Sequence, residues 1–78
     1  MIRCPCCGFL TIDDSADIIT DICEVCFWQY DKTAQDMPDK IIGANKVSLN
    51  TAKKNYRLLG AIEGRFIDMV RLPHKDEL

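Results

Sequence analysis

Two pairs of cysteines near the start of the chain constrain its fold more than any other feature. Cys4 and Cys7 form one pair, Cys23 and Cys26 form the other, and two residues separate the members of each. This spacing lets a pair turn both sulfurs toward one point, and two such knuckles complete a tetrahedron around a metal ion. We therefore predict one metal site with Cys4, Cys7, Cys23 and Cys26 as its ligands.

The short length of the chain indicates that the metal stabilises the fold. With 78 residues, the sequence predicts a single domain over 1–78. A chain this short buries only about 60% of the surface that it exposes when unfolded, so its apolar core alone is marginal. Four thiolates leave no open position on the metal, which favours a structural zinc ion over a catalytic one. Tetrahedral sulfur ligation also suits iron, and five thiols without metal remain a further alternative.

The use of cysteine also indicates the compartment. The residues after Met1 show no charged region followed by an apolar run, and no stretch approaches the roughly 18 apolar residues that span a membrane. Five is an odd number, which fits disulfide pairing poorly. We expect a cytoplasmic protein with reduced thiols. The tetrapeptide at 75–78, Lys-Asp-Glu-Leu, matches a retention signal of the endoplasmic reticulum, and we interpret this match as coincidental.

Hydrophobic patterning in the first part of the chain predicts short strands. Residues 9–12 and 18–22 favour the two strands of a hairpin around a turn at 13–17. The aromatic segment 27–30 favours a third strand, and 31–47 is expected to be irregular.

A helix is expected later in the chain. Ser48 is a candidate N-cap, apolar residues then recur on one face, and Gly60 can end the helix. Beyond Gly60, the spacing of Ile62, Phe66 and Val70 suits a second short helix, whereas residues 66–72 suit an extended chain equally well. The predicted fold is a small, metal-stabilised α+β domain. It has a zinc-ribbon-like two-knuckle hairpin over 1–30 and an α-helix over 48–60.

Charge is distributed unevenly along the chain. Residues 1–39 contain two Lys or Arg and eight Asp or Glu, which gives 2 − 8 = −6, whereas residues 40–78 give 8 − 4 = +4. An acidic surface attracts basic partners and repels phosphate. We therefore predict a basic protein partner for the first half. Trp28 is expected to pack over the metal site, whereas an exposed Trp28 would be an aromatic anchor for that partner. The predicted partner-binding residues are Asp13, Asp14, Asp17, Trp28, Asp31, Asp36 and Asp39.

Three motifs together resemble the bacterial cysteine-rich CPCC family. They are Cys-Pro-Cys-Cys-Gly at 4–8, Cys-x-x-Cys-Phe-Trp at 23–28 and Gly-Ala-Asn-x-Val-Ser-Leu at 43–49. Glu24 departs from the pattern, because a proline often stands there. The family is named for its motif and not for an activity. The resemblance implies a small stand-alone protein, and some members are candidate immunity proteins encoded near toxins.

These observations favour a non-enzymatic binding protein, with a toxin as one candidate partner. The chain has a single histidine and shows neither an HExxH motif nor a nucleophile elbow, so no hydrolase is indicated. The first alternative is a nucleic-acid-binding zinc ribbon that uses Lys46, Lys53, Lys54 and Arg57. An isoelectric point near 5.2 speaks against it. A rubredoxin-like or other redox metal protein is the second alternative.

Cys6 is surplus to the four predicted ligands. As the third residue of Cys-Pro-Cys-Cys, it is expected to direct its thiol away from the metal. A small packing residue and a reactive or substitute thiol are both open interpretations.

Overall fold

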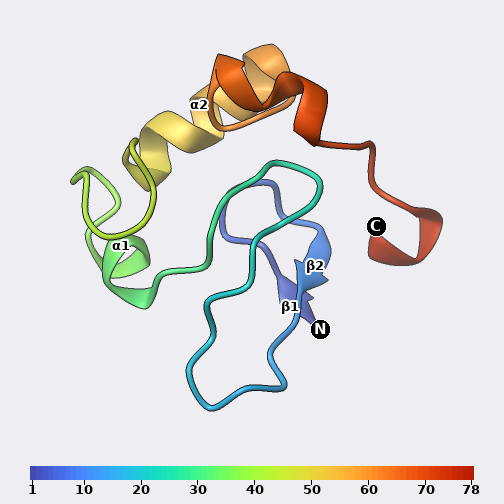
Figure 1. The fold of residues 1–78 in the computed structure, drawn as a ribbon, viewed down its shortest axis with the longest axis horizontal. Helices are drawn as coiled ribbons and strands as arrows, with labels where there is room; N and C mark the ends of the chain where they lie inside the picture. Colours follow the sequence, from blue (N-terminus) through green and yellow to red (C-terminus); the bar gives the residue numbers. More distant parts are fainter.

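The computed structural model describes residues 1–78 as a flat molecule with extents of 31 × 31 × 16 Å (Figure 1). Helices form an arc along one edge, and the two strands lie beneath it. Much of the chain outside the helices is irregular. In chain order the elements are strands β1 (Ile2–Arg3) and β2 (Leu10–Ile12), helices α1 (Lys32–Asp36) and α2 (Leu49–Leu59), and the 3₁₀ helices η1 (Gly64–Met69) and η2 (Lys75–Glu77).

The hairpin is built differently from the one expected. β2 lies within the predicted strand 9–12, but its antiparallel partner is β1, where Ile2 stands opposite Ile12. The predicted returning strand over 18–22 is wrong, because only Ile22 pairs, in a single bridge to Gln29. That bridge is also all that remains of the predicted third strand over 27–30.

Aspartate side chains explain why the segment after β2 does not form a strand. Asp13 accepts a hydrogen bond from the backbone N–H of Ser15 at 2.9 Å, and Asp21 accepts one from the N–H of Asp13 at 2.8 Å. Such local side-chain bonds give the backbone an alternative to a strand ladder. The chain therefore leaves β2 as a loop over residues 13–21, which extends away from the helices in Figure 1 and which we call the acidic loop.

Helix α2 confirms the helix expected over 48–60, including both of its caps. The Ser48 hydroxyl accepts a hydrogen bond from Thr51 N–H at 3.1 Å, which satisfies a free donor of the first turn. Gly60 adopts φ 81° and donates its N–H to the carbonyl of Tyr56, which is a left-handed helix end.

The segments before and after α2 are more ordered than the sequence indicates. The region expected to be irregular, 31–47, contains α1, which Asp31 caps by accepting from the N–H groups of Thr33 and Ala34. After Gly60, the chain forms the 3₁₀ helix η1 and then runs extended to Pro73. The expectation of a second short helix is thus met by a tighter helix than an α-helix.

The buried core is built around the cysteines rather than beside them. Cys4, Cys23 and Cys26 are fully buried and belong to one apolar cluster with Trp28. The later part of the chain binds directly to this centre, because the N–H of Ile62 donates to the carbonyl of Cys26 at 3.0 Å. The cluster comprises Cys4, Ile12, Cys23, Val25, Cys26, Trp28, Ala34, Leu49, Ala52 and Ile62. None of the helices combines the length and apolar character needed to cross a membrane.

Candidate metal centre

The first cysteine pair sits on a tight backbone turn. The N–H of Gly8 donates to the carbonyl of Cys4 at 2.9 Å, and the N–H of Cys4 donates to the carbonyl of Phe9 at 2.8 Å. Gly8 takes φ 83°, a left-handed conformation that glycine adopts without steric cost. The turn brings Cys7 back over Cys4.

The second pair repeats this turn with a different residue at its bend. The N–H of Phe27 donates to the carbonyl of Cys23 at 2.8 Å, and the N–H of Cys23 donates to the carbonyl of Trp28 at 2.8 Å. Phe27 occupies the place of Gly8 and takes φ 75°, the one positive φ among the non-glycine residues. Its ring stacks on Phe66 of η1, with centroids 4.4 Å apart. This stacking offsets the steric cost of the left-handed backbone.

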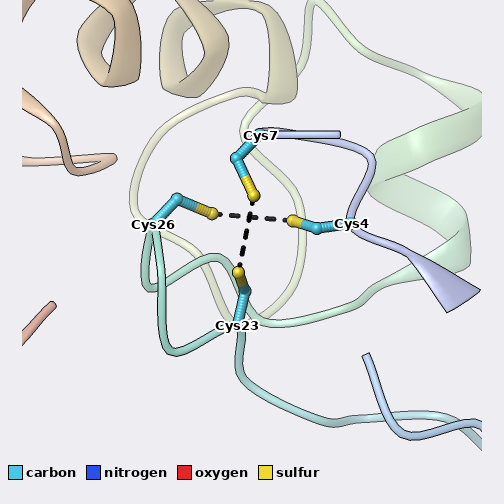
Figure 2. A group of neighbouring side chains, drawn as sticks. All are labelled: Cys4, Cys7, Cys23 and Cys26. Atoms are coloured by element: carbon cyan, nitrogen blue, oxygen red, sulfur yellow. Dashed lines mark hydrogen bonds between the residues drawn. The ribbon is translucent and has the colours of Figure 1, made fainter. Parts of the chain in front are cut away.

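The two turns bring four sulfur atoms to one point (Figure 2). All four lie within 4.8 Å of one another, with 3.5 Å between Cys4 Sγ and Cys26 Sγ and 3.6 Å between Cys7 Sγ and Cys23 Sγ. A disulfide would need about 2.05 Å, and all five cysteines are free. A tetrahedron with zinc–sulfur bonds of about 2.3 Å has edges of about 3.8 Å. The cluster therefore has the size and donor set of a tetrahedral metal site.

Hydrogen-bond donors surround the sulfurs on the protein side. The hydroxyl of Thr11 lies 2.9 Å from Cys23 Sγ, and the N–H of Trp28 donates to Cys26 Sγ at 3.5 Å. Donors in these positions stabilise thiolate charge and orient metal ligands. Because Cys4, Cys23 and Cys26 are buried, the centre is closed to solvent except near the half-buried Cys7.

The thiols strongly affect one another's ionisation. Contact with Cys23 raises the pKa of Cys26 and of Cys4, whereas hydrogen bonding from Cys26 lowers the pKa of Cys23. Crowded thiols therefore do not all ionise unless a cation replaces their protons. Helix α2 places Tyr56 near the cluster, where burial followed by the charge of Cys7 raises the pKa of its phenol.

Cys6 is not part of the four-sulfur cluster. It is half-buried and packs against the apolar core. Its place in the first turn corresponds to that of Val25 in the second, and Val25 is a buried core residue. This correspondence favours the interpretation of Cys6 as a packing residue.

The acidic residues predicted to bind a partner fall into two groups. Asp13, Asp14 and Asp17 lie in the acidic loop, all exposed, although no hairpin tip is formed there. Asp13 accepts from Ser15 N–H, and Asp14 pairs with the N-terminal amine at 2.9 Å. Asp17 makes no hydrogen bond or ion pair.

The second group has structural roles that the charge count did not reveal. Asp31 caps α1, Asp36 pairs with Lys32 one turn away, and Asp39 accepts from the side chain of Asn50. The sequence signal for the first two was an N-cap residue followed by an i,i+4 ion pair.

Trp28 packs beside the clustered cysteines, as the first of its two interpretations expects, and it is not the surface anchor of the second. Its side chain is 0% exposed, because the second turn directs the ring into the core beside the cysteines. Its indole N–H has no hydrogen-bond partner.

No sequence pattern indicates a role for Arg71, yet this residue ties the C-terminal segment to the second cysteine pair. Its guanidinium binds both carboxylate oxygens of Glu77, at 2.7 and 2.8 Å, and one oxygen of Glu24 at 3.1 Å. Arg71 lowers the pKa of Glu77 to about 2, with help from the N–H of His74. Glu24, where the resemblance led us to expect a proline, thus has an ion-pair partner.

Comparison with known proteins identifies a family. No curated protein and no solved structure matches the chain. A family model described as Cysteine-rich CPCC matches residues 2–77, which is nearly the whole chain and includes all four clustered cysteines. The expected resemblance is confirmed. The chain belongs to the cysteine-rich CPCC family.

Proposed function

We propose that this protein is a small non-enzymatic binding protein whose fold is held by one zinc ion on Cys4, Cys7, Cys23 and Cys26. The sulfur–sulfur distances of 3.5 and 3.6 Å carry the metal assignment, since they are close to the edge of a zinc–sulfur tetrahedron. Four thiolates fill the coordination sphere, so the metal supplies stability and not a reactive water. Zinc in such sites is worth on the order of 10–16 kcal/mol to small peptides at neutral pH.

Native mass spectrometry combined with metal analysis tests this assignment. We expect one zinc per chain and unfolding when a strong chelator removes it. A well-folded protein that carries no metal, or a red iron form as purified, would contradict the zinc assignment.

The binding part of the proposal rests on the acidic first half, which carries a net charge of −6 over residues 1–39. Four thiolates with one zinc ion add −4 + 2 = −2 to this half. A basic protein surface is the complementary partner, and nucleic acid is repelled. The resemblance also implies a candidate immunity role. From this role and the acidic charge, we propose that the partner is a basic toxin domain in the cytoplasm. A nuclease whose active site attracts phosphate has the required charge.

Charge reversal on matched surfaces tests the binding proposal. Asp14→Lys with Asp17→Lys reverses two exposed acids of the acidic loop. Asp68→Lys with Asp76→Lys makes the same change in net charge on the later half, where both carboxylates are exposed and have no ion-pair partner. The partner to use first is the product of the neighbouring gene, in a pull-down at several salt concentrations.

We expect the first pair of substitutions to weaken binding and reduce its salt dependence, and the second pair to leave binding within about twofold. Equal losses in both double variants would contradict an acidic docking surface. A gel shift with RNA and DNA tests the alternative function, a nucleic-acid-binding zinc ribbon. Tight, salt-sensitive binding of the unaltered protein to nucleic acid, abolished by Lys53→Glu with Arg57→Glu, would replace the proposal.

A further inference from the structure

A groove lies between the acidic loop and the start of α1. Its volume is about 550 Å³, and it is partly open to solvent. The residues that line it are Asp17–Thr20, Gln29–Thr33 and Ala44. None of the four clustered cysteines lines the groove, so it is separate from the metal centre.

The walls of the groove carry exposed apolar surface. Ile18 leaves 79% of its surface exposed, and the neighbouring Ile19 and Tyr30 are half-buried. An isoleucine exposed to this degree gains from contact with a second apolar side chain, at about 25 cal/mol per Å² of surface removed from water. An aliphatic group of a partner therefore fits this side of the groove.

The charge around the groove is negative and partly unpaired. Asp17 has no hydrogen bond and no ion pair. Lys32 is the single cation of the lining, and it is already paired with Asp36. The acidic loop contains four aspartates and no lysine or arginine between residues 13 and 21. Charge complementarity thus selects a cationic side chain.

Unpaired backbone groups beside the groove indicate the conformation of the partner segment. The N–H and C=O groups of Ile18, Ile19 and Thr20 make no hydrogen bond to any other group of the protein. Three consecutive residues with unpaired backbone groups can pair with an extended chain, as in peptide recognition by strand addition. A compact helix on the partner would leave these groups unused.

From these three features we infer that the groove holds an extended segment of the partner protein in which a lysine or arginine stands next to an aliphatic residue. The cation pairs with Asp17, the aliphatic side chain covers Ile18, and the backbone pairs with residues 18–20. This inference rests on the proposed function, whose binding surface it narrows to one site.

Synthetic peptides test the site without knowledge of the natural partner. The probe is a fluorescein-labelled octapeptide that alternates lysine and valine. Two matched peptides replace either every lysine by glutamate or every valine by serine. Fluorescence anisotropy at low salt measures affinity, and amide chemical shifts of the zinc-loaded ¹⁵N-labelled protein locate the binding surface.

We expect the lysine–valine peptide to bind at least about tenfold more tightly than either matched peptide, and to shift the amides of Ile18–Thr20 and Tyr30–Thr33. Asp17→Lys and Ile18→Ser should each weaken binding about tenfold or more, with Asp68→Lys as the control that leaves it unchanged. The amide spectrum of each variant confirms that the fold is kept.

The outcomes separate the groove from the proposed function. Shifts confined to Asp36, Asp39 and their neighbours would overturn the groove while leaving an acidic binding surface in place. Equal affinity of the lysine–valine and lysine–serine peptides would overturn the apolar part of the inference. No binding of any lysine peptide at low salt would overturn the groove as a peptide site, while the pull-down with the charge-reversed variants tests the proposed function separately.

Discussion

Each cysteine turn contains one residue with a left-handed backbone. Substitutions at these two positions measure how much the left-handed conformation costs in free energy of unfolding. Gly8 and Phe27 stand at the same place in the two turns, at φ 83° and 75°. A residue with a Cβ loses about 1–2 kcal/mol in this conformation, and glycine loses about 0.5–1 kcal/mol of extra chain entropy on folding. The difference predicts that glycine is better than alanine at both positions by about 1 kcal/mol.

Two comparisons measure this difference. Gly8→Ala should destabilise the protein by about 1 kcal/mol through conformation alone, because an added Cβ would meet no atom within 4 Å. At Phe27 the ring must first be removed. Phe27→Ala should cost about 2 kcal/mol, less than a fully buried phenylalanine, because the ring is only half-buried and stacks on Phe66. Phe27→Gly should recover about 1 kcal/mol of that loss.

Urea denaturation at a fixed concentration of free zinc gives these free energies of unfolding on one scale, since changes in free metal alone would shift them. Gly60→Ala is the control, because Gly60 has φ 81° and open space around it but lies at the end of α2, outside both turns. In the interior of a helix or strand, glycine is ordinarily the less stable choice. At the left-handed end of α2, however, Gly60→Ala should lose about 1 kcal/mol, as Gly8→Ala does. If Phe27→Gly is no more stable than Phe27→Ala, the second turn does not hold a strained residue and the reasoning fails.

Three further predictions concern the sulfurs and the C-terminal segment. Cys23→Ser should release the zinc and unfold the protein, whereas Cys6→Ser should keep both, as read by native mass spectrometry and thermal melts. Thr11→Val removes the hydroxyl 2.9 Å from Cys23 Sγ and should lower zinc affinity about tenfold in a chelator competition. The pKa of Glu77 is lowered to about 2, so its pairing with Arg71 stabilises the fold above the ordinary carboxyl pKa of about 4.5 and is lost as pH falls toward 2. Amide shifts of η2 should follow that titration, and Arg71→Gln should move it up toward 4.5.

The parts of the structure that the sequence predicts well are those fixed by local chemistry. The spacing of Cys4, Cys7, Cys23 and Cys26 identifies the cluster, since two intervening residues are what one tight turn needs. Ser48 and Gly60 mark the ends of α2 because each satisfies backbone groups that the helix leaves free. In these cases a few neighbouring residues carry the whole signal.

The parts that the sequence did not predict depend on partners far along the chain. β1 is only two residues long and shows no alternation, yet it takes the place beside β2 that residues 18–22 were expected to fill. Whether Trp28 faces the core or the solvent depends on how the second turn is oriented. The ion pairs of Arg71 join residues 47 and 6 positions apart, and no local pattern indicates them.

The placement of the cysteines inside the apolar cluster affects how much of the protein a cell can maintain. Other domains fill their centre with leucine and isoleucine, which need nothing from outside the chain. Here three thiols occupy that centre, and Ile62 is hydrogen-bonded to the backbone of Cys26. With zinc as the proposed metal, a chain made during zinc shortage has too little core to stay folded, and proteases that degrade unfolded chains remove it. The abundance of the protein would then follow the zinc supply of the cell, even with constant transcription.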